Sequence, residues 1–127
     1  MFNRTLSIAF LFFQLLMHGI PGVNLQVERF RSASSSYIEV SMYIVGSSLK
    51  CVPAEEYGVT YMIMIRDVNA NVVAGDRFRL SNKGCPRKDL IDVKRFALQD
   101  GKYTVDVEMN DILDPLNDLS IRQAIVI

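Results

Sequence analysis

Alternation of apolar and polar residues dominates the chain after residue 22. It is clearest from Tyr103 to Asn110, where apolar side chains occupy every second position. A period of two is typical of a β-strand that buries one face. In the partial alternation of residues 90–98, the apolar positions are Ile91, Val93 and Phe96. Complete or partial patterns of this kind predict strands over residues 37–45, 49–52, 59–66, 72–80, 90–98, 103–110 and 121–127.

Two of these strands form a predicted hairpin. Residues 59–66 and 72–80 are separated by residues 67–71, a polar segment typical of a turn. Met62 and Met64 make the second face of the first strand apolar as well, which favours a central position in a sheet. No helical period is sustained after residue 22, and short strands follow one another closely. The sequence therefore predicts an all-β sandwich of about seven strands.

The N-terminal segment has a different character. Arg4 is the only charged residue before Glu28, and a run of mostly apolar residues over 6–17 precedes a Pro-Gly break. A basic start, a short apolar run and such a break are the pattern of a secretory signal peptide. We therefore predict a signal peptide over residues 1–22 and a β-sandwich domain over residues 23–127. The predicted location is the periplasm or the extracellular space.

The alternative for this segment is a retained membrane anchor. A helix needs about 20 apolar residues to cross a bilayer, and this run is shorter and contains Gln14. If the segment is not cleaved, it is the part of the chain expected to contact a membrane. At the other end, the last predicted strand is still apolar at Ala124–Ile127, a pattern expected of a domain truncated at its C-terminus.

Charge and residue content exclude several functions. The chain has 14 basic and 14 acidic residues, so it lacks the basic excess of a nucleic-acid binder. Its one histidine, His18, falls within the predicted signal peptide. A domain over residues 23–127 therefore cannot form a Ser-His-Asp or Cys-His pair, or a histidine-ligated metal site. No cofactor and no catalytic residue are predicted.

Cys51 and Cys85 are the two cysteines of the chain, and both lie beside a lysine and a proline in loop-like segments. Export permits a disulfide between them, because exported proteins meet an oxidising environment. Closing a loop of this length is worth about 4 kcal/mol in the chain-entropy model. The alternative is two separate buried thiols.

A local motif precedes the clearest strand. Leu98, Gly101 and Tyr103 follow the spacing Leu-x-x-Gly-x-Tyr. In immunoglobulin-like sandwiches, such a tyrosine packs its ring inward and bonds its hydroxyl to nearby backbone, an arrangement called a tyrosine corner. The glycine supplies the backbone freedom that the turn needs. The alternative is an ordinary hairpin with a tyrosine at its start.

The order of these features resembles a family. A strand at 37–45, a hairpin at 59–80, the Leu98-x-x-Gly101-x-Tyr103 motif and then Asp111 are similar to the β-rich domain of Bacteroidetes secreted proteins named for a Gly-Trp-x-Thr-Asp motif. The naming motif itself is absent, because the chain has no tryptophan. The resemblance implies an extracytoplasmic immunoglobulin-like module and transfers no catalytic residue.

Possible ligand sites have weaker support than solvated or structural alternatives. Asp67-x-Asn69-x-Asn71 begins like a calcium loop, but Val72 stands where glycine is required, which favours a hairpin turn. An acidic loop could gather oxygen ligands at an irregular spacing, and a basic middle region could bind acidic glycans or phosphates. The acidic loop comprises Asn110, Asp111, Asp114, Asn117 and Asp118, and the basic region Arg77, Arg79, Lys83, Arg87, Lys88, Lys94 and Arg95.

Three functions remain open. The first is a non-catalytic interaction or structural module of the cell envelope, with protein partners or neighbouring domains. The second is a carbohydrate-binding module, for which Tyr37, Tyr43 and Tyr57 could form a platform in place of tryptophan. The third is a hydrolase, but Asp106 and Glu108 are expected on the exposed face of their strand, without an evident cleft.

Overall fold

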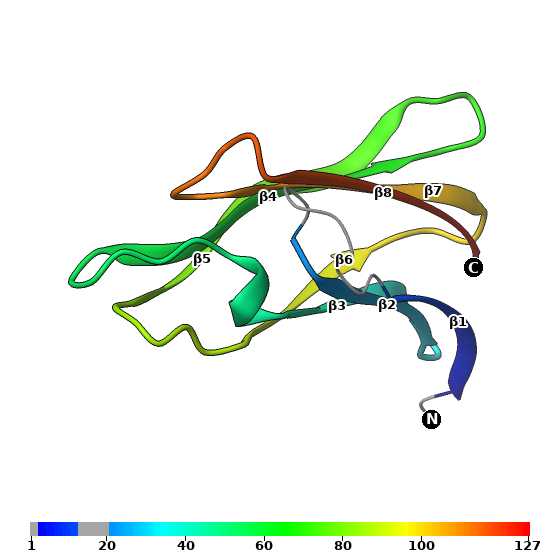
Figure 1. The fold of residues 1–127 in the computed structure, drawn as a ribbon. Helices are drawn as coiled ribbons and strands as arrows, with labels where there is room; N and C mark the ends of the chain where they lie inside the picture. Colours follow the sequence, from blue (N-terminus) through cyan, green and yellow to red (C-terminus); the bar gives the residue numbers. More distant parts are fainter. Residues whose placement is uncertain (1–2, 13–20) are drawn as a thin grey trace.

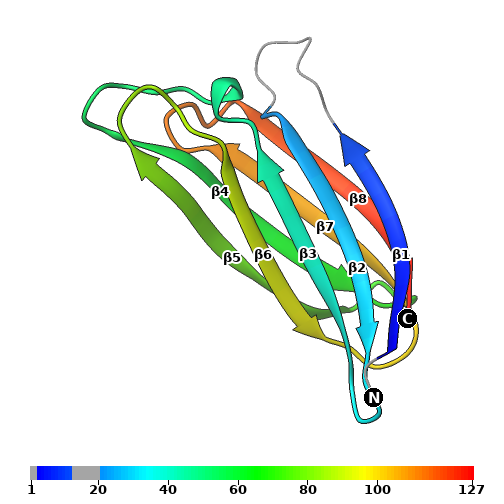
Figure 2. The same cartoon turned by 90° about the horizontal axis from the view of Figure 1, so that it is seen from below.

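The protein is a sandwich of two antiparallel sheets (Figures 1 and 2). The computed structural model describes residues 3–12, as backbone alone, and residues 21–127. Sheet A contains, in spatial order, β1 (Asn3–Phe12), β2 (Val23–Arg31), β3 (Ser36–Ile44) and β6 (Leu90–Ala97). Sheet B contains β5 (Val72–Lys83), β4 (Glu56–Arg66), β7 (Lys102–Asp111) and β8 (Asp118–Val126). The short 3-10 turn η1 (Gly46–Ser48) follows β3.

The connections have the topology of an immunoglobulin-like sandwich. The chain passes from sheet A to sheet B between β3 and β4, returns between β5 and β6, and crosses again between β6 and β7. Seven of the strands lie within residues 23–126, and all described strand pairs are antiparallel. The predicted all-β sandwich is confirmed.

The core forms where the inner faces of both sheets meet. Strands β2, β3, β4 and β7 each place every second side chain there, as the pleat of a β-strand requires. Each fully buried aliphatic side chain stabilises the fold by about 1.5–3 kcal/mol. The side chains with no more than 1% exposure include Val23, Leu25, Val27, Ile38, Val40, Met42, Ile44, Val59, Ile63, Ile65, Val105, Val107 and Met109.

Strands β1 and β2 are the elements that the sequence analysis did not predict. The sequence of β2 does show the alternating pattern of a strand, because Val23, Leu25 and Val27 alternate with polar residues. Strand β1 uses part of the apolar run assigned to the signal peptide and pairs with β2 in the full-length chain. Residues 1–2 and 13–20 of that segment lie outside the described residues. The signal peptide stays a prediction, and its removal would make β2 an edge strand.

The predicted short strand over residues 49–52 is wrong. This segment is part of the loop between η1 and β4. Leu49 is buried with 1% exposure, and Cys51 is bonded to Cys85, so core packing and a covalent link explain the apolar positions without a strand. Ala54, with a φ of 67°, then turns the chain toward β4.

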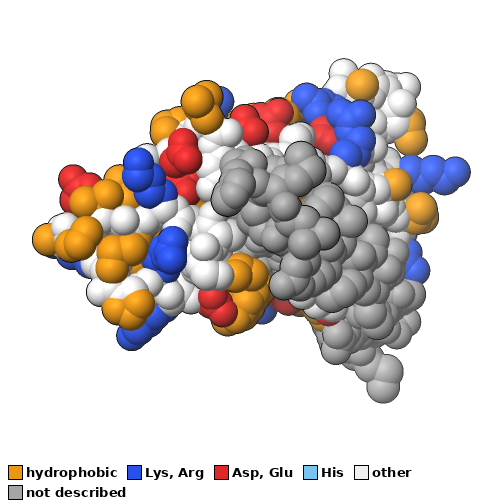
Figure 3. Space-filling view, in the orientation of Figure 1, with side chains coloured by type: hydrophobic (Ala, Val, Ile, Leu, Met, Phe, Trp, Pro, Cys, Tyr) orange, Lys and Arg blue, Asp and Glu red, His pale blue; other side chains and the backbone are white. Residues whose placement is uncertain are grey.

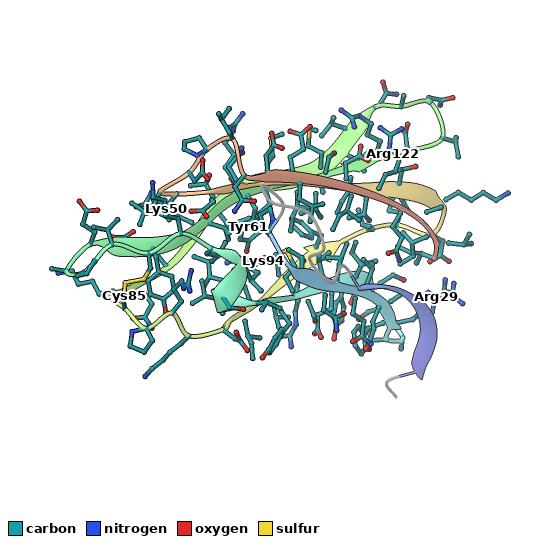
Figure 4. All side chains as sticks on the ribbon, viewed as in Figure 1. Arg29, Lys50, Tyr61, Cys85, Lys94 and Arg122 are labelled. Atoms are coloured by element: carbon teal, nitrogen blue, oxygen red, sulfur yellow. A yellow bond between two sulfur atoms is a disulfide. The ribbon has the colours of Figure 1, made fainter. Side chains whose placement is uncertain are left out.

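The predicted disulfide is confirmed. Cys51 and Cys85 are bonded, with their Cα atoms 6.0 Å apart. The bond joins the loop before β4 to the loop after β5, at the end of the sandwich where Figure 4 labels Cys85. It therefore connects the two ends of the β4–β5 hairpin.

Tyr103 has the hydrogen bond of a tyrosine corner. Its hydroxyl donates to the carbonyl of Gln99 at 2.6 Å, four residues earlier in the chain. Leu98 is buried, and the backbone of Gly101 exchanges two hydrogen bonds with Ile127. The expected need for glycine is wrong: Gly101 has no positive φ, and a Cβ there would be in ordinary contact with the Tyr103 hydroxyl oxygen at 3.4 Å. The Tyr103 ring is half-buried rather than fully enclosed.

The corner predicts unequal effects at neighbouring positions. Tyr103→Phe should lower the free energy of unfolding by about 1 kcal/mol, because it removes the bond to Gln99. Tyr103→Ala should cost about 3 kcal/mol, because it also removes the packed ring. Thr104→Ala, on the outer face of β7, should cost clearly less. Urea unfolding measures all three, and equal losses at the two positions would contradict the corner.

Candidate functional site

In the middle of strand β6, apolar residues face outward and charged residues face inward, whereas Leu90 and Phe96 of the same strand pack against the core. The partial alternation predicted there is present, but Ile91 and Val93 point outward, with 66% and 45% exposure. Their register partners on β3 are Tyr43 and Ser41. Tyr43 is also exposed, at 39%. We call Tyr43, Ile91 and Val93 the β6 strip, an apolar surface on the outer face of sheet A.

The two central inward positions of β6 carry charge instead. Asp92 accepts a hydrogen bond from the Tyr61 hydroxyl of β4, and the Lys94 amine lies 3.5 Å from the same carboxylate. Lys94 also lies over the ring of Phe78, 4.3 Å from its centroid. Figure 4 shows Tyr61 and Lys94 between the two sheets. Asp92 and Lys94 therefore have partners on sheet B, and their inward position leaves Ile91 and Val93 outside.

Tyr61 is held in its protonated form. Only 3% of the residue is exposed. Burial, and then the hydrogen bond to Asp92, raise the pKa of Tyr61 well above its ordinary value. Its hydroxyl is therefore a fixed donor to Asp92. The contact between Tyr61 and Asp92 links the two sheets at the side of the sandwich where β5 and β6 lie. The Tyr61 hydroxyl offers no ionised group for nucleophilic chemistry.

One end of the β6 strip is anchored to a loop. The Tyr43 hydroxyl donates to Asp89, and the other carboxylate oxygen accepts the Gly46 N–H at 2.8 Å. These two bonds lower the pKa of Asp89, with the Tyr43 bond the larger cause. A Cβ at Gly46 would lie 2.4 Å from the Lys88 carbonyl oxygen, so this close approach requires glycine. The Tyr43 ring is thereby held at the rim of the surface.

The far end of the same face is aromatic and charged. Phe30 and Tyr37 stack with ring centroids 5.1 Å apart. Arg95 lies 6.0 Å from the Tyr37 centroid and pairs with Glu39 at 2.8 Å. The outer face of sheet A thus joins an apolar strip to a rim of aromatic and paired ionic groups.

The tyrosine platform predicted for a sugar ligand is only partly present. Tyr37 and Tyr43 share the outer face of β3, but Tyr57 is wrong for this role, because its exposure is 1%. The Tyr57 hydroxyl bonds instead to the backbone of Lys88. Tyrosine occurs both in protein cores and on protein surfaces, and the sequence around Tyr57 does not indicate which of the two applies.

The basic residues do not form one patch. Arg77 and Arg79 lie on the outer face of sheet B, whereas Lys94 points inward and Arg95 lies on sheet A. The other three, Lys83, Arg87 and Lys88, lie at or near the loop between β5 and β6. In the view of Figure 3, Lys and Arg side chains are interspersed with acidic and hydrophobic ones. The predicted basic middle region is therefore dispersed by the fold.

The expectation that Asp106 is exposed is wrong. It does share the outer face of β7 with Glu108, but its exposure is 6%. Arg66 and Arg122 both bond to its carboxylate, with the Arg122 Nε at 2.7 Å, and together they cover it. Asp106 is consequently an ion-pair centre, and Glu108 alone remains exposed.

The acidic loop is organised by internal hydrogen bonds. Asp111, with 1% exposure, accepts the backbone N–H of Lys50 at 2.7 Å and of Leu113 at 2.9 Å, and the Asn117 amide at 3.1 Å. These bonds attach the loop before β8 to the loop before β4. Within residues 21–127, no group of His, Cys, Asp or Glu side chains is arranged to hold a metal ion.

The segment resembling a calcium loop is a hairpin turn. The Asp67 carboxylate accepts the backbone N–H groups of Asn69 at 2.9 Å and Asn71 at 3.0 Å. Ala70, with a φ of 64°, completes the turn between β4 and β5. The carboxylate is thereby used within the turn, as the hairpin interpretation predicts.

No family model, no curated protein and no solved structure matches this chain. Among the described residues, no helix is long and apolar enough to cross a membrane. The β6 strip with its rim is a surface feature on which a functional interpretation can be based.

The anchoring of Tyr43 predicts a change in the titration of Asp89. Tyr43→Phe should raise the pKa of Asp89 toward the ordinary value of 3.8, because the larger of its two lowering bonds is lost. The stabilisation from this carboxylate is present above its unfolded pKa and is lost as pH falls through the lower folded pKa. Carboxyl NMR titration measures the shift, with Tyr37→Phe as control. An Asp89 titration that is unchanged by Tyr43→Phe would contradict this anchoring.

Proposed function

We propose that this chain is a non-catalytic, extracytoplasmic interaction module of the cell envelope that binds a protein partner through the β6 strip. The observation that carries the proposal is the outward orientation of Ile91 and Val93, with 66% and 45% exposure. Both are β-branched aliphatic side chains on an edge strand, where a solvated face would ordinarily carry polar residues.

The composition of the surface supports a protein partner. Interfaces are enriched in aromatic residues and arginine, with an apolar centre and a polar rim. Here Ile91 and Val93 form the centre, and Tyr43 and the Glu39–Arg95 pair form the rim. The expected partner presents apolar side chains to the centre and hydrogen-bonding groups to the rim.

The assignment as a non-catalytic module rests on the available side chains. Residues 23–127 contain no histidine. The two most buried carboxylates of sheet B, Asp106 and Asp111, are occupied by guanidinium groups and by N–H donors. Neither is free to act as a general acid or base, which supports a non-catalytic module.

Carbohydrate binding is the alternative function. Tyr43 is exposed on the outer face of sheet A, and Tyr37 lies six residues earlier on the same strand. This spacing corresponds to about 20 Å, too far for both rings to stack on one sugar. Binding on a glycan array that disappears with Tyr43→Ala would favour this alternative.

Photo-crosslinking tests the proposed surface. A photoreactive amino acid in place of Ile91 should crosslink to a distinct protein in the producing cell, and Val93→Asp in the same chain should abolish that product. The same probe in place of Asn69, an exposed residue in the turn between β4 and β5, is the matched control. Mass spectrometry identifies the product. Equal crosslinking at both positions would contradict a specific role for the β6 strip.

Export is tested separately. The exported chain should begin near Val23, because the predicted signal peptide ends at Gly22. N-terminal sequencing of the protein from the periplasmic or extracellular fraction measures this. A chain that keeps Met1 in a membrane fraction would instead indicate the retained anchor.

A further inference from the structure

Among the described residues, Arg77 and Glu108 are two opposite charges on the outer face of sheet B that form no ion pair within the chain. Arg77 on β5 and Glu108 on β7 are both in register with Met62 of β4, one on each side of it. Both are exposed, and within residues 21–127 neither side chain has an ion-pair partner. By contrast, Arg79 pairs with Glu56 on the same face, at 2.6 Å.

A hollow lies between these charges. It has a volume of about 510 Å³. Thr60 and Met62 form its floor, with Arg77 and Arg79 on one wall and Glu108 and Asn110 on the other. Met62 is half-buried, and its flexible thioether is suited to contact with another protein surface.

We propose that this face binds a second copy of the chain, turned about a two-fold axis that runs along β4. That rotation places Met62 against Met62 of the second copy. It also brings Arg77 opposite Glu108 of the second copy, and Glu108 opposite its Arg77. The dimer therefore contains two Arg77–Glu108 pairs, one on each side of the axis, as a self-complementary two-fold interface requires.

The distribution of charge selects this axis. A two-fold axis in the same plane but perpendicular to β4 would place Arg77 against Arg77 and Glu108 against Glu108, which like-charge repulsion disfavours. Packed sheets lie about 10 Å apart, a gap that an arginine and a glutamate reaching from opposite sides can bridge.

The next rows of the face fit the same arrangement. Arg79 and Asn110, both in register with Thr60, would lie opposite one another across the axis. Gly75 and Asp106, both in register with Met64, would also lie opposite one another. A Cβ at Gly75 would lie 2.2 Å from the Ile63 carbonyl oxygen, so this position has no side chain. It leaves room for the guanidinium groups that surround Asp106 in the second copy.

The proposal predicts reversible, salt-sensitive dimerisation. Sedimentation velocity of the full chain between about 1 μM and 1 mM should show a monomer–dimer equilibrium that weakens at high salt. Arg77→Glu or Glu108→Arg alone should weaken association at least about tenfold, because each places like charges opposite one another. Lys88→Glu, in the loop after β5, is the matched charge-reversal control and should have little effect.

Mixing the two variants gives the decisive measurement. The Arg77→Glu variant has negative charges at both positions 77 and 108, and the Glu108→Arg variant has positive charges at both. A mixture should therefore form a one-to-one heterodimer, although neither variant associates with itself. Circular dichroism checks that both remain folded. A chain that is monomeric throughout, or dimers that both reversals leave intact, would overturn the proposal. Crosslinking at Ile91 tests the other face, so the two proposals can fail independently.

Discussion

The pairing of β4 with β7 in the middle of sheet B is the constraint on which the rest of the molecule depends. Val59 pairs with Asp111 at one end of this ladder and Arg66 with Thr104 at the other. A slip of one residue would exchange the inner and outer faces of a strand, because side chains alternate. Burial of Ile63 and Val107 opposes any such slip. The same register also points the Tyr61 side chain of β4 inward, where its hydroxyl donates to Asp92 of β6 in the other sheet.

The two lateral openings of the sandwich are closed by polar side chains that point inward. At the β5–β6 side these are Asp92 and Lys94, which have partners on sheet B. At the opposite side, Arg29 of β2 donates to the carbonyl of Val126 in β8 at 2.6 Å, near the C-terminus in Figure 4. On β6, which is an edge strand of sheet A, the inward-pointing charges disfavour the addition of a further strand. The outer sheet faces are therefore more suitable for binding than this edge.

The loop end beside the disulfide is built from contacts between distant parts of the chain. Asp111 bonds to Lys50, Arg87 donates to the carbonyl of Leu49 at 2.5 Å, and Asp89 bonds to Gly46. With the Cys51–Cys85 bond, these contacts hold three connections together where no strand pairing is available. This explains why the acidic and basic residues of these loops serve mainly in the structure.

Most of the fold could be predicted from the local sequence pattern, but which side chains are exposed on the surface could not. The period of two between Tyr103 and Asn110, the turn at Asp67 and the motif ending in Tyr103 depend on neighbours in the chain, and they identified the strands and the class of fold. Which face of β6 turns inward depends instead on Tyr61 and Phe78, which come from other strands. Asp106 is covered, and Tyr57 is buried, for the same reason. A sequence pattern specifies the period of a strand, but its orientation and burial are decided by the sheet that packs against it.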